Sequence, residues 1–252
     1  MIIWITGASS GLGRELALQY AKASHAVYAS ARNLDALNKL CSDAQDLPGV
    51  IYPVALDITD MVNVDNCINQ MKEKSDVSFP DLAILNAGTY IENPVKDFDR
   101  NIYTRLMGIN YIGTINCLQG LIPEYAQRGY GKIAIVSSVA GYRGLPKASA
   151  YGASKAALIN LCESLQPELK TLNIDLRLIN PGFVRTPLTD LNEFPMPFLM
   201  EVDKAAERII KGLSKNNFEI TFPRRFTWIL KILRLLPYRI YLNLTKNILK
   251  ND

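Results

Sequence analysis

The sequence contains very little histidine and cysteine for its length. Among 252 residues there is one histidine, His25, and there are four widely separated cysteines: Cys41, Cys67, Cys117 and Cys162. Zinc centres, Cys–His nucleophiles and Ser–His–Asp triads need such residues in groups, so the sequence predicts no metal site and none of these centres. Scattered thiols without a CxxC pair are typical of a reducing compartment, and we therefore expect a cytoplasmic protein.

Long apolar runs are also missing. No stretch of about 18 apolar residues occurs, so no membrane-spanning helix is expected. The first strand is expected directly after Met1, which leaves no room for a signal peptide. The hydrophobic content of 48% and the charged content of 21% are ordinary for a folded protein. A chain of 252 residues is long enough for one large α/β domain.

Positive charge is concentrated at the carboxyl end. The net charge is +4, and residues 224–252 carry seven basic residues and one acid, a net +6 that leaves −2 for residues 1–223. A body that is close to neutral argues against a general nucleic-acid surface. We expect residues 1–223 to form the main domain and residues 224–252 to be a basic and apolar appendage of it.

Apolar β-rich runs alternate with segments of helical periodicity, which is the pattern of βαβ units and a parallel sheet. The predicted strands are residues 2–6, 26–31, 50–55, 82–85, 132–137, 174–179 and 219–221. The predicted helices lie near residues 12–24, 34–45, 60–74, 99–127, 150–171 and 203–214. Right-handed crossovers then give a doubly wound sheet, whose ligands bind beyond the carboxyl ends of the strands.

A glycine-rich run follows the first predicted strand directly. Residues 6–13 read TGASSGLG and lead into a helical pattern. Glycines allow a tight turn and a close approach of backbone to a pyrophosphate, and the following helix offers unpaired N–H groups. The spacing is GxxxGxG rather than the usual GxGxxG of dinucleotide sites. The position between strand and helix nevertheless predicts a phosphate-binding turn.

The end of the second predicted strand indicates which nucleotide is bound. An acid at this point holds a ribose 2′-hydroxyl, whereas an arginine accommodates a 2′-phosphate. The strand ends in ASARN, without an acid and with Arg32. Its guanidinium can pair with a phosphate, so NADP(H) is favoured over NAD. Arg32 could instead be a surface residue at the start of a helix.

Tyr151 and Lys155 form a pair of catalytic type. They are four residues apart on a predicted helix, which places both side chains on one face. A phenol ordinarily titrates near pH 10, which is too high for proton transfer at neutral pH. An adjacent ammonium favours the phenolate and should lower that pKa.

Taken together, these features resemble the short-chain dehydrogenase/reductase family. The motifs lie in order within residues 1–215: TGASSGLG at 6–13, NAG at 86–88, Ser138, YxxxK at 151–155 and NPG at 180–182. The resemblance implies a Rossmann-like, doubly wound parallel sheet of about seven strands with helices on both faces. It also implies an NADP(H)-dependent oxidoreductase that interconverts a carbonyl and a primary or secondary alcohol on a small molecule. Homodimers or homotetramers are usual in the family.

The resemblance assigns catalytic roles to four residues. Tyr151 is expected to be the general acid and base at the substrate oxygen, and Lys155 to lower its pKa and hold the nicotinamide ribose. Ser138 is expected to hydrogen-bond the substrate carbonyl, and Ser137 is its rival with a less suitable spacing. Asn110 resembles the helix asparagine that positions a water behind the lysine for proton relay.

The resemblance also implies a set of dinucleotide contacts. Asp57 would contact the adenine amino group, and Asn86, Ala87 and Gly88 would line the adenine-ribose side. The phosphate turn, the catalytic pair and the segment around the nicotinamide supply the rest: Gly7, Ser9, Ser10, Gly11, Leu12, Gly13, Tyr151, Lys155, Pro181, Gly182, Val184 and Thr186. Ser10 departs from the pattern, since many NADP-preferring members carry a base there.

Other interpretations stay open at this point. Asp57 and Asn110 could be capping or turn residues. A dinucleotide-binding scaffold or redox sensor without turnover is the main alternative function, although a pure binding protein needs no acid/base tyrosine. An isomerase or dehydratase on the same fold is a further alternative.

The segment 187–202 and the carboxyl end are rich in apolar residues. The first includes Phe194, Pro195, Met196, Pro197, Phe198, Leu199 and Met200, and it either covers an apolar substrate or packs on the body. Residues 226–242 predict a helix that Pro237 ends or kinks. That helix could pack on the body or on another subunit, line the substrate entrance, or make peripheral contact with a membrane through residues 224–250.

Overall fold

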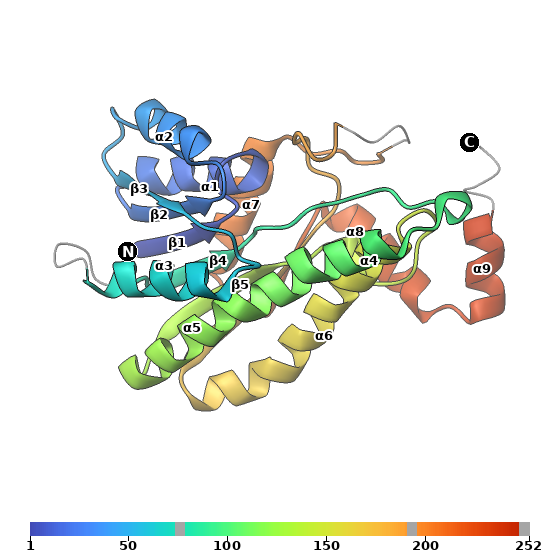
Figure 1. Ribbon diagram of the computed structural model, residues 1–252. Coiled ribbons are helices and arrows are strands. Elements are labelled where there is room, and N and C mark those ends of the chain that lie inside the picture. The colour runs from blue at the N-terminus through green and yellow to red at the C-terminus, as the bar shows by residue number, and fades with distance from the viewer. Residues whose placement is uncertain (74–78, 191–195, 247–252) are drawn as a thin grey trace.

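Seven parallel strands form the centre of the molecule (Figure 1). The computed structural model describes residues 1–73, 79–190 and 196–246. The strands are ordered β3-β2-β1-β4-β5-β6-β7, which confirms the predicted doubly wound sheet. Their bounds are β1 Ile2–Thr6, β2 Ala26–Ala31, β3 Val50–Ala55, β4 Leu82–Leu85, β5 Gly131–Val136, β6 Ile174–Pro181 and β7 Glu219–Phe222.

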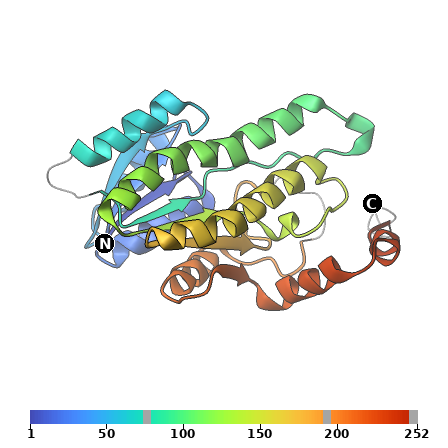
Figure 2. The same cartoon turned by 90° about the horizontal axis from the view of Figure 1, so that it is seen from below.

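Helices cover both faces of this sheet, and each face has its own apolar core. One core lies under α1 (Gly11–Lys22), α2 (Leu34–Asp43) and α7 (Val202–Leu213). The other lies under α3 (Met61–Glu73), α5 (Gly113–Arg128) and α6 (Ser149–Thr171), and α5 and α6 run along the same face in both views (Figures 1 and 2). Burial on two sides explains why β4 reads LAIL without alternation.

The predicted helix at 99–127 is built of three parts. It consists of α4 (Arg100–Leu106), a π-helical turn at Met107–Ile112 and α5. The periodicity of the sequence gives no sign of the π turn, which adds a residue per turn and is frequent at functional sites. Asn110 lies in this turn and is fully buried.

Most other predicted bounds agree to within two residues, and the differences have local causes. The strand predicted at 132–137 is β5, which begins and ends one residue earlier. The strand predicted at 174–179 continues to Pro181, because Asn180 and Pro181 pair in register with Thr221 and Phe222 of β7. A proline is tolerated at such a strand end, where one ladder hydrogen bond fewer is made.

Two helices follow β7. They are α8 (Arg224–Leu235) and α9 (Tyr238–Lys246), and Pro237 lies between them as predicted. Figure 1 shows α9 at the end of the molecule away from the N-terminus, and Figure 2 shows both helices along one edge. None of the helices in the described ranges has both the length and the apolar character needed to cross a bilayer.

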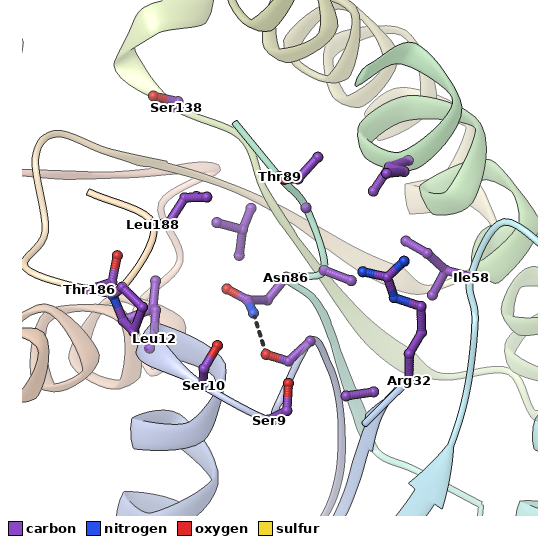
Figure 3. Close-up of a pocket in the computed structure, with 18 of the residues that line it drawn as sticks. Ser9, Ser10, Leu12, Arg32, Ile58, Asn86, Thr89, Ser138, Thr186 and Leu188 are labelled. Atoms are coloured by element: carbon purple, nitrogen blue, oxygen red, sulfur yellow. Dashed lines mark hydrogen bonds between the residues drawn. The ribbon is translucent and has the colours of Figure 1, made fainter. Parts of the chain in front are cut away.

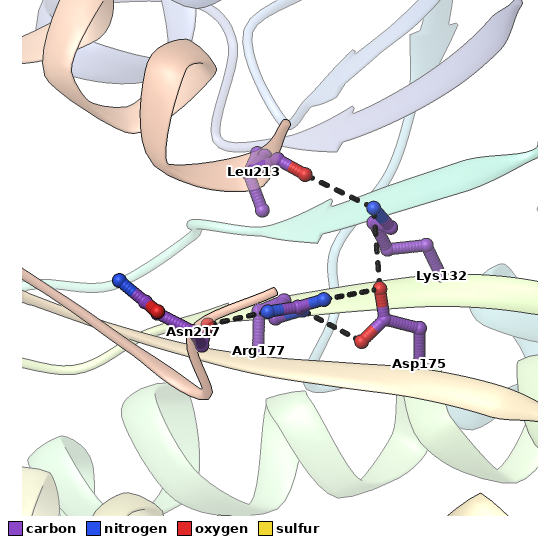
Figure 4. A network of polar contacts seen from close by, with 5 residues as sticks. All are labelled: Lys132, Asp175, Arg177, Leu213 and Asn217. Carbon is purple, nitrogen blue, oxygen red and sulfur yellow. Dashed lines mark hydrogen bonds and ion pairs between the residues drawn. The ribbon is translucent and has the colours of Figure 1, made fainter. Parts of the chain in front are cut away.

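A polar network joins β5, β6 and the end of α7 (Figure 4). The buried guanidinium of Arg177 donates to both carboxylate oxygens of Asp175, at 2.6 and 2.9 Å, and to the Asn217 carbonyl at 2.5 Å. Lys132 adds an ion pair to Asp175 at 3.1 Å and a hydrogen bond to the Leu213 carbonyl at 3.0 Å. Burial acts to raise the pKa of Asp175, but hydrogen bonds from Arg177 and Lys132 hold it below its ordinary value.

We expect Asp175→Asn to lower the free energy of unfolding by about 1–2 kcal/mol at pH 7, because Arg177 loses its counter-charge. This loss of unfolding free energy is smaller than for a fully buried ion pair, because the Asp175 side chain is 37% exposed. A carboxyl with a lowered folded-state pKa stabilises above its unfolded pKa of about 3.9 and loses this effect as the pH falls through the folded value. Urea unfolding should therefore show a difference that narrows below about pH 4. An equal loss in Asp65→Asn, an exposed carboxylate of α3, would contradict the role of the network.

Candidate active site

A cleft of about 850 Å³ opens at the carboxyl ends of the strands, between β1 and β4 where the strand order reverses. This is where doubly wound sheets bind ligands. Its wall includes most of the residues named from the sequence: Gly7, Ser9, Ser10, Gly11, Leu12, Arg32, Asp57, Asn86, Ala87, Gly88, Ser138, Tyr151, Lys155, Pro181, Gly182, Val184 and Thr186. Gly13 and Asn110 are absent from the described wall and lie behind it.

The glycine-rich turn is held in shape by close backbone packing. Gly7 has φ +70°, a value that side chains other than glycine rarely adopt. A Cβ on Gly13 would lie 2.3 Å from the Gly7 carbonyl oxygen, so α1 can approach the turn only without a side chain there. The amide of Asn86 donates to the carbonyls of Thr6 and Gly7 at 3.0 and 3.3 Å, which ties the turn to β4 (Figure 3).

The first turn of α1 fits an anion. Ser10 precedes the helix and makes no side-chain cap, and the first turn contains no acid. The free N–H groups and the positive end of the helix dipole therefore face the cleft, as in known phosphate sites. Across the cleft, Arg32 extends its guanidinium from the end of β2 (Figure 3). The glycine turn, this helix end and the cation fit the phosphates of a dinucleotide.

Asp57 has a structural role in its own loop. Its Oδ1 accepts hydrogen bonds from the Thr59 N–H at 2.9 Å and from the Thr59 hydroxyl at 2.7 Å. Burial acts to raise the pKa of Asp57, but these two bonds and the charge of Arg32 bring it below its ordinary value. The turn-residue interpretation is thus supported by contacts, and the carboxylate also lines the cleft.

The structure distinguishes the two serines that follow β5. The Ser137 hydroxyl is buried and donates to the backbone carbonyl of Lys155 at 2.8 Å. The Ser138 hydroxyl accepts the Ala140 N–H at 3.1 Å and lines the cleft together with the Tyr151 phenol, whose pKa it acts to lower. Ser138 therefore faces the tyrosine in the cleft, while Ser137 joins β5 to α6.

Tyr151 and Lys155 lie on one face of α6, as predicted. The Lys155 amine is 5.7 Å from the centroid of the Tyr151 ring and donates to the Val136 carbonyl at 3.0 Å. Lys155 is only 4% exposed, and burial lowers its pKa to about 8. The ring of Tyr90 packs edge-on against that of Tyr151, with centroids 5.1 Å apart.

The expected lowering of the Tyr151 pKa by Lys155 is wrong for the protein by itself. Burial raises the pKa of this phenol, and the nearby Ser138 hydroxyl opposes the rise. Low solvation disfavours the phenolate for the same reason that it disfavours the ammonium of Lys155. In the described contacts, the group that lowers the phenol pKa is Ser138.

Asn110 links the π-helical turn to the strand end and to α6. Its Oδ1 accepts the Thr89 N–H at 2.8 Å, and its amide donates to the Thr89 carbonyl and to Ser154 Oγ, both at 3.0 Å. Ser154 in turn donates to the Tyr151 carbonyl at 2.8 Å. The asparagine side chain therefore fixes the positions of its neighbours, and a Cβ on Gly88 would lie 3.2 Å from its Oδ1 and 3.4 Å from the Lys155 amine.

The segment after β6 closes one end of the cleft. Val184 bridges Met200, and the Arg185 N–H donates to the Met200 carbonyl at 2.8 Å. Thr189 Oγ1 donates to the Val184 carbonyl at 2.7 Å and accepts the Thr186 N–H at 2.9 Å. Of the predicted apolar segment, Phe194 and Pro195 lie outside the described residues.

Several residues at the cleft were not named from the sequence. Ile58 and Thr89 lie in the loops that follow β3 and β4, so the rule that ligands bind at strand ends could have found them. Leu188 and Thr189 lie in a segment predicted only as a cover. Neither Tyr90 nor Ser154 carries a sequence signal for its contacts. Among the described residues, no group of three histidine, cysteine or acidic side chains could hold a metal ion.

With this geometry, the chain belongs to the short-chain dehydrogenase/reductase family. The family model for short chain dehydrogenases matches residues 1–194. An uncharacterized oxidoreductase of Myxococcus xanthus is 35% identical over 238 residues, covering 94% of this chain and 93% of its own. A 3-oxoacyl-[acyl-carrier-protein] reductase of Thermotoga maritima is 30% identical over 186 residues, covering 74% of this chain and 75% of its own.

Solved structures share the fold. A short-chain dehydrogenase from Streptomyces avermitilis superimposes with a TM-score of 0.82 at 23% identity, covering 99% of this chain and 98% of its own. One from Sphingobium yanoikuyae in complex with NADPH has a TM-score of 0.79 at 24% identity, covering 88% and 87%. One from Burkholderia phymatum in complex with NAD has a TM-score of 0.82 at 20% identity, covering 91% of each chain.

The low pKa of Lys155 predicts a distinct pH dependence of stability without added nucleotide. Its pKa is about 8 in the folded protein and about 10.4 in the unfolded chain, so the unfolded state binds more protons between these values. The folded state should therefore gain stability as the pH rises from 8 to 10. Urea unfolding of the wild type and of Lys155→Met should show the wild type gaining relative to the variant in that range. If the difference in free energy of unfolding between the two proteins stayed constant from pH 8 to pH 10, the lowered pKa of Lys155 would be contradicted.

Proposed function

We propose that this oxidoreductase is NADP(H)-dependent and interconverts a carbonyl and a primary or secondary alcohol, with Tyr151 as its acid and base. The observation that carries the proposal is that Ser138, Tyr151 and Lys155 line one cleft together with the phosphate turn, with the Lys155 amine 5.7 Å from the centroid of the Tyr151 ring. A protein that only bound or sensed a dinucleotide would have no use for a phenol placed beside this serine and this lysine. The isomerase and dehydratase alternatives have no observation in their favour.

Each residue has a separate task in carbonyl reduction. The bound dinucleotide would supply the hydride for the carbonyl carbon. Ser138 donates a hydrogen bond to the carbonyl oxygen, and Tyr151 transfers its phenolic proton to the same oxygen as the alcohol forms. Lys155 would hold the nicotinamide ribose, and Asn110 is a positioning residue that keeps Thr89 and Ser154 in place near the lysine. Alcohol oxidation reverses these transfers.

Arg32 supports NADP(H) as the coenzyme. Its guanidinium lies at the end of β2, where a 2′-phosphate would be held, and no acid of that strand end competes with it. Asp57 would contact the adenine amino group, and Asn86 to Gly88 the adenine ribose. Pro181, Gly182, Val184 and Thr186 would surround the nicotinamide. Structural relatives hold either NADPH or NAD, so the arginine is the argument for the choice.

Apolar side chains beside the cleft favour a hydrophobic substrate. Phe226 packs against Phe183 and Phe198 and lies next to Gly182, which lines the cleft. Two relatives are named for chemistry of this kind: the Thermotoga reductase and the human 17-beta-hydroxysteroid dehydrogenase type 1, which is 34% identical over 191 residues and of which the match covers 57%. The proposal also includes a cytoplasmic location and assembly into a homodimer or homotetramer. It further treats residues 1–223 as the catalytic domain and residues 224–252 as an appendage of that domain.

Tyr151→Phe should abolish nearly all turnover, by about 100-fold or more, because the phenylalanine has no proton to give. Affinity for NADPH should stay within about twofold, since the ring is kept. The assay is NADPH oxidation with a panel of ketones, aldehydes and quinones, and NADPH binding is followed by cofactor fluorescence. Tyr130→Phe, at an exposed position in the turn between α5 and β5 and outside the cleft wall, is the matched control and should keep full activity. Turnover of Tyr151→Phe near the wild-type value would refute the assignment.

Arg32→Ala should weaken NADPH binding by roughly 10-fold to 100-fold while changing NADH affinity little, because only NADPH presents a phosphate to the guanidinium. Fluorescence titration with both coenzymes measures the two affinities. Arg100→Ala, which removes an exposed arginine at the start of α4, serves as the control for a general charge effect. Equal affinity of the wild type for both coenzymes, or equal losses in Arg32→Ala, would overturn the NADP(H) choice.

A further inference from the structure

The orientation of α8 on the body is fixed by contacts on one side of the helix. Thr227 is 1% exposed, and Phe226 packs against the rings of Phe183 and Phe198, with centroids 5.7 and 5.9 Å apart. Lys231 forms an ion pair with Glu219, which also accepts a 2.5 Å hydrogen bond from the Tyr142 hydroxyl. The opposite side of α8 therefore faces outward.

The outward side of α8 is apolar, which is unusual for a helix in contact with water. Trp228, Ile232 and Leu235 are 66%, 59% and 83% exposed, and their i, i+4, i+7 spacing aligns them in one row. Ile229 lies beside this row and is 49% exposed. Single exposed apolar residues are normal, but a continuous row of large ones marks an interaction surface.

The second helix is held against the same loop as the end of α8 and adds further exposed apolar residues to this part of the molecule. Arg143 donates to the carbonyls of Leu233 and Leu236 at the end of α8, at 2.6 and 2.7 Å, and its guanidinium lies 3.9 Å from the centroid of the Tyr241 ring. The Tyr241 hydroxyl donates to the Gly144 carbonyl at 2.6 Å. These contacts hold α9 with Tyr238 and Leu242 exposed, at 77% and 58%.

Cations surround these apolar residues, and no acid accompanies them. Residues 224–246 contain six basic residues and neither aspartate nor glutamate. Five of the six are exposed: Arg224, Arg225, Arg234, Arg239 and Lys246. We call this combined surface the α8–α9 face, defined by these five cations together with Trp228, Ile229, Ile232, Leu235, Tyr238 and Leu242.

We propose that the α8–α9 face binds the surface of an anionic lipid bilayer. An interfacial helix buries a row of apolar side chains at the boundary of the acyl chains, and flanking lysines and arginines pair with lipid phosphates and carboxylates. A two-fold contact between copies of this chain would instead bring this face against itself, cation against cation, without a carboxylate of its own to compensate. The charge of the face thus selects lipid over a second copy.

The proposed function gives this attachment a consequence. Phe226, on the inner side of α8, lies 3.1 Å from the position of a Cβ on Gly182, at the rim of the cleft. A bilayer bound to the outer side of the same helix would lie next to that rim, where an apolar substrate dissolved in lipid could enter. Lipid binding itself does not depend on the catalytic assignment.

Tryptophan fluorescence reports directly on the face. The chain has two tryptophans, of which Trp4 is fully buried and Trp228 is 66% exposed. Vesicles of equimolar phosphatidylcholine and phosphatidylserine should shift the emission to the blue and sediment with the full-length protein. Vesicles of phosphatidylcholine alone should bind more weakly by on the order of tenfold or more, and high salt should reduce binding to the mixed vesicles.

Two double variants test the two parts of the face. Ile232→Ser with Leu235→Ser removes apolar contact, and Arg225→Glu with Arg239→Glu reverses charge; each should weaken vesicle binding by about tenfold or more. The matched control is Val62→Ser with Val95→Ser, which removes two exposed apolar side chains elsewhere on the surface. Thermal unfolding midpoints check that all three variants fold.

Three results would overturn the proposal. Equal vesicle binding by the wild type and both face variants would mean that the face is not the contact. Equal binding to both kinds of vesicle would remove the role of anionic lipid. A failure to bind vesicles, together with self-association that Ile232→Ser with Leu235→Ser abolishes, would assign the face to a second copy. None of these measurements uses turnover, so a failure here is distinct from a failure of the proposed function.

Discussion

The buried amine of Lys155 is the constraint on which the geometry of the cleft depends. A buried ammonium needs a hydrogen-bond acceptor, and the Val136 carbonyl at the end of β5 provides it. Ser137, the next residue along the chain, bonds the Lys155 backbone, so β5 and α6 are joined at this point by both side chains. These contacts bring Ser138 and Tyr151 together, because Ser138 follows Ser137 in the chain and Tyr151 lies one helical turn before Lys155.

The fold was largely predictable because burial on two sides leaves a strong pattern. Strands such as β4 and β5 consist of continuous apolar residues, and the helices between them have a clear period. The π-helical turn at Met107–Ile112 was not predictable, since the side-chain contacts of Asn110 with Thr89 and Ser154 come from distant parts of the chain. The extension of β6 to Pro181 likewise depends on pairing with β7.

The catalytic residues could be named from their order and spacing, but their electrostatics could not. Spacing placed Tyr151 and Lys155 on one face and favoured Ser138 over Ser137. The predicted lowering of the Tyr151 pKa was wrong because burial of the phenol, to which the edge contact with Tyr90 contributes, raises that pKa. A sequence pattern gives the spacing and the charge of residues, but it does not give how far each side chain is shielded from water. For Asp57 they left two roles open, and its contacts with Thr59 show that a turn residue can also line the cleft.

The C-terminal helices support the cleft from outside. Arg143 lies on the same loop as Ser138 and holds the end of α8, while Glu219 at the start of β7 connects Tyr142, Asn180 and Lys231. Removing residues after 223 would leave the Arg143 guanidinium without its carbonyl partners and uncover Gly182 where Phe226 packs. A truncated chain would therefore change the catalytic loop as well as the outer face. Only substitutions on the exposed side of α8 separate the two.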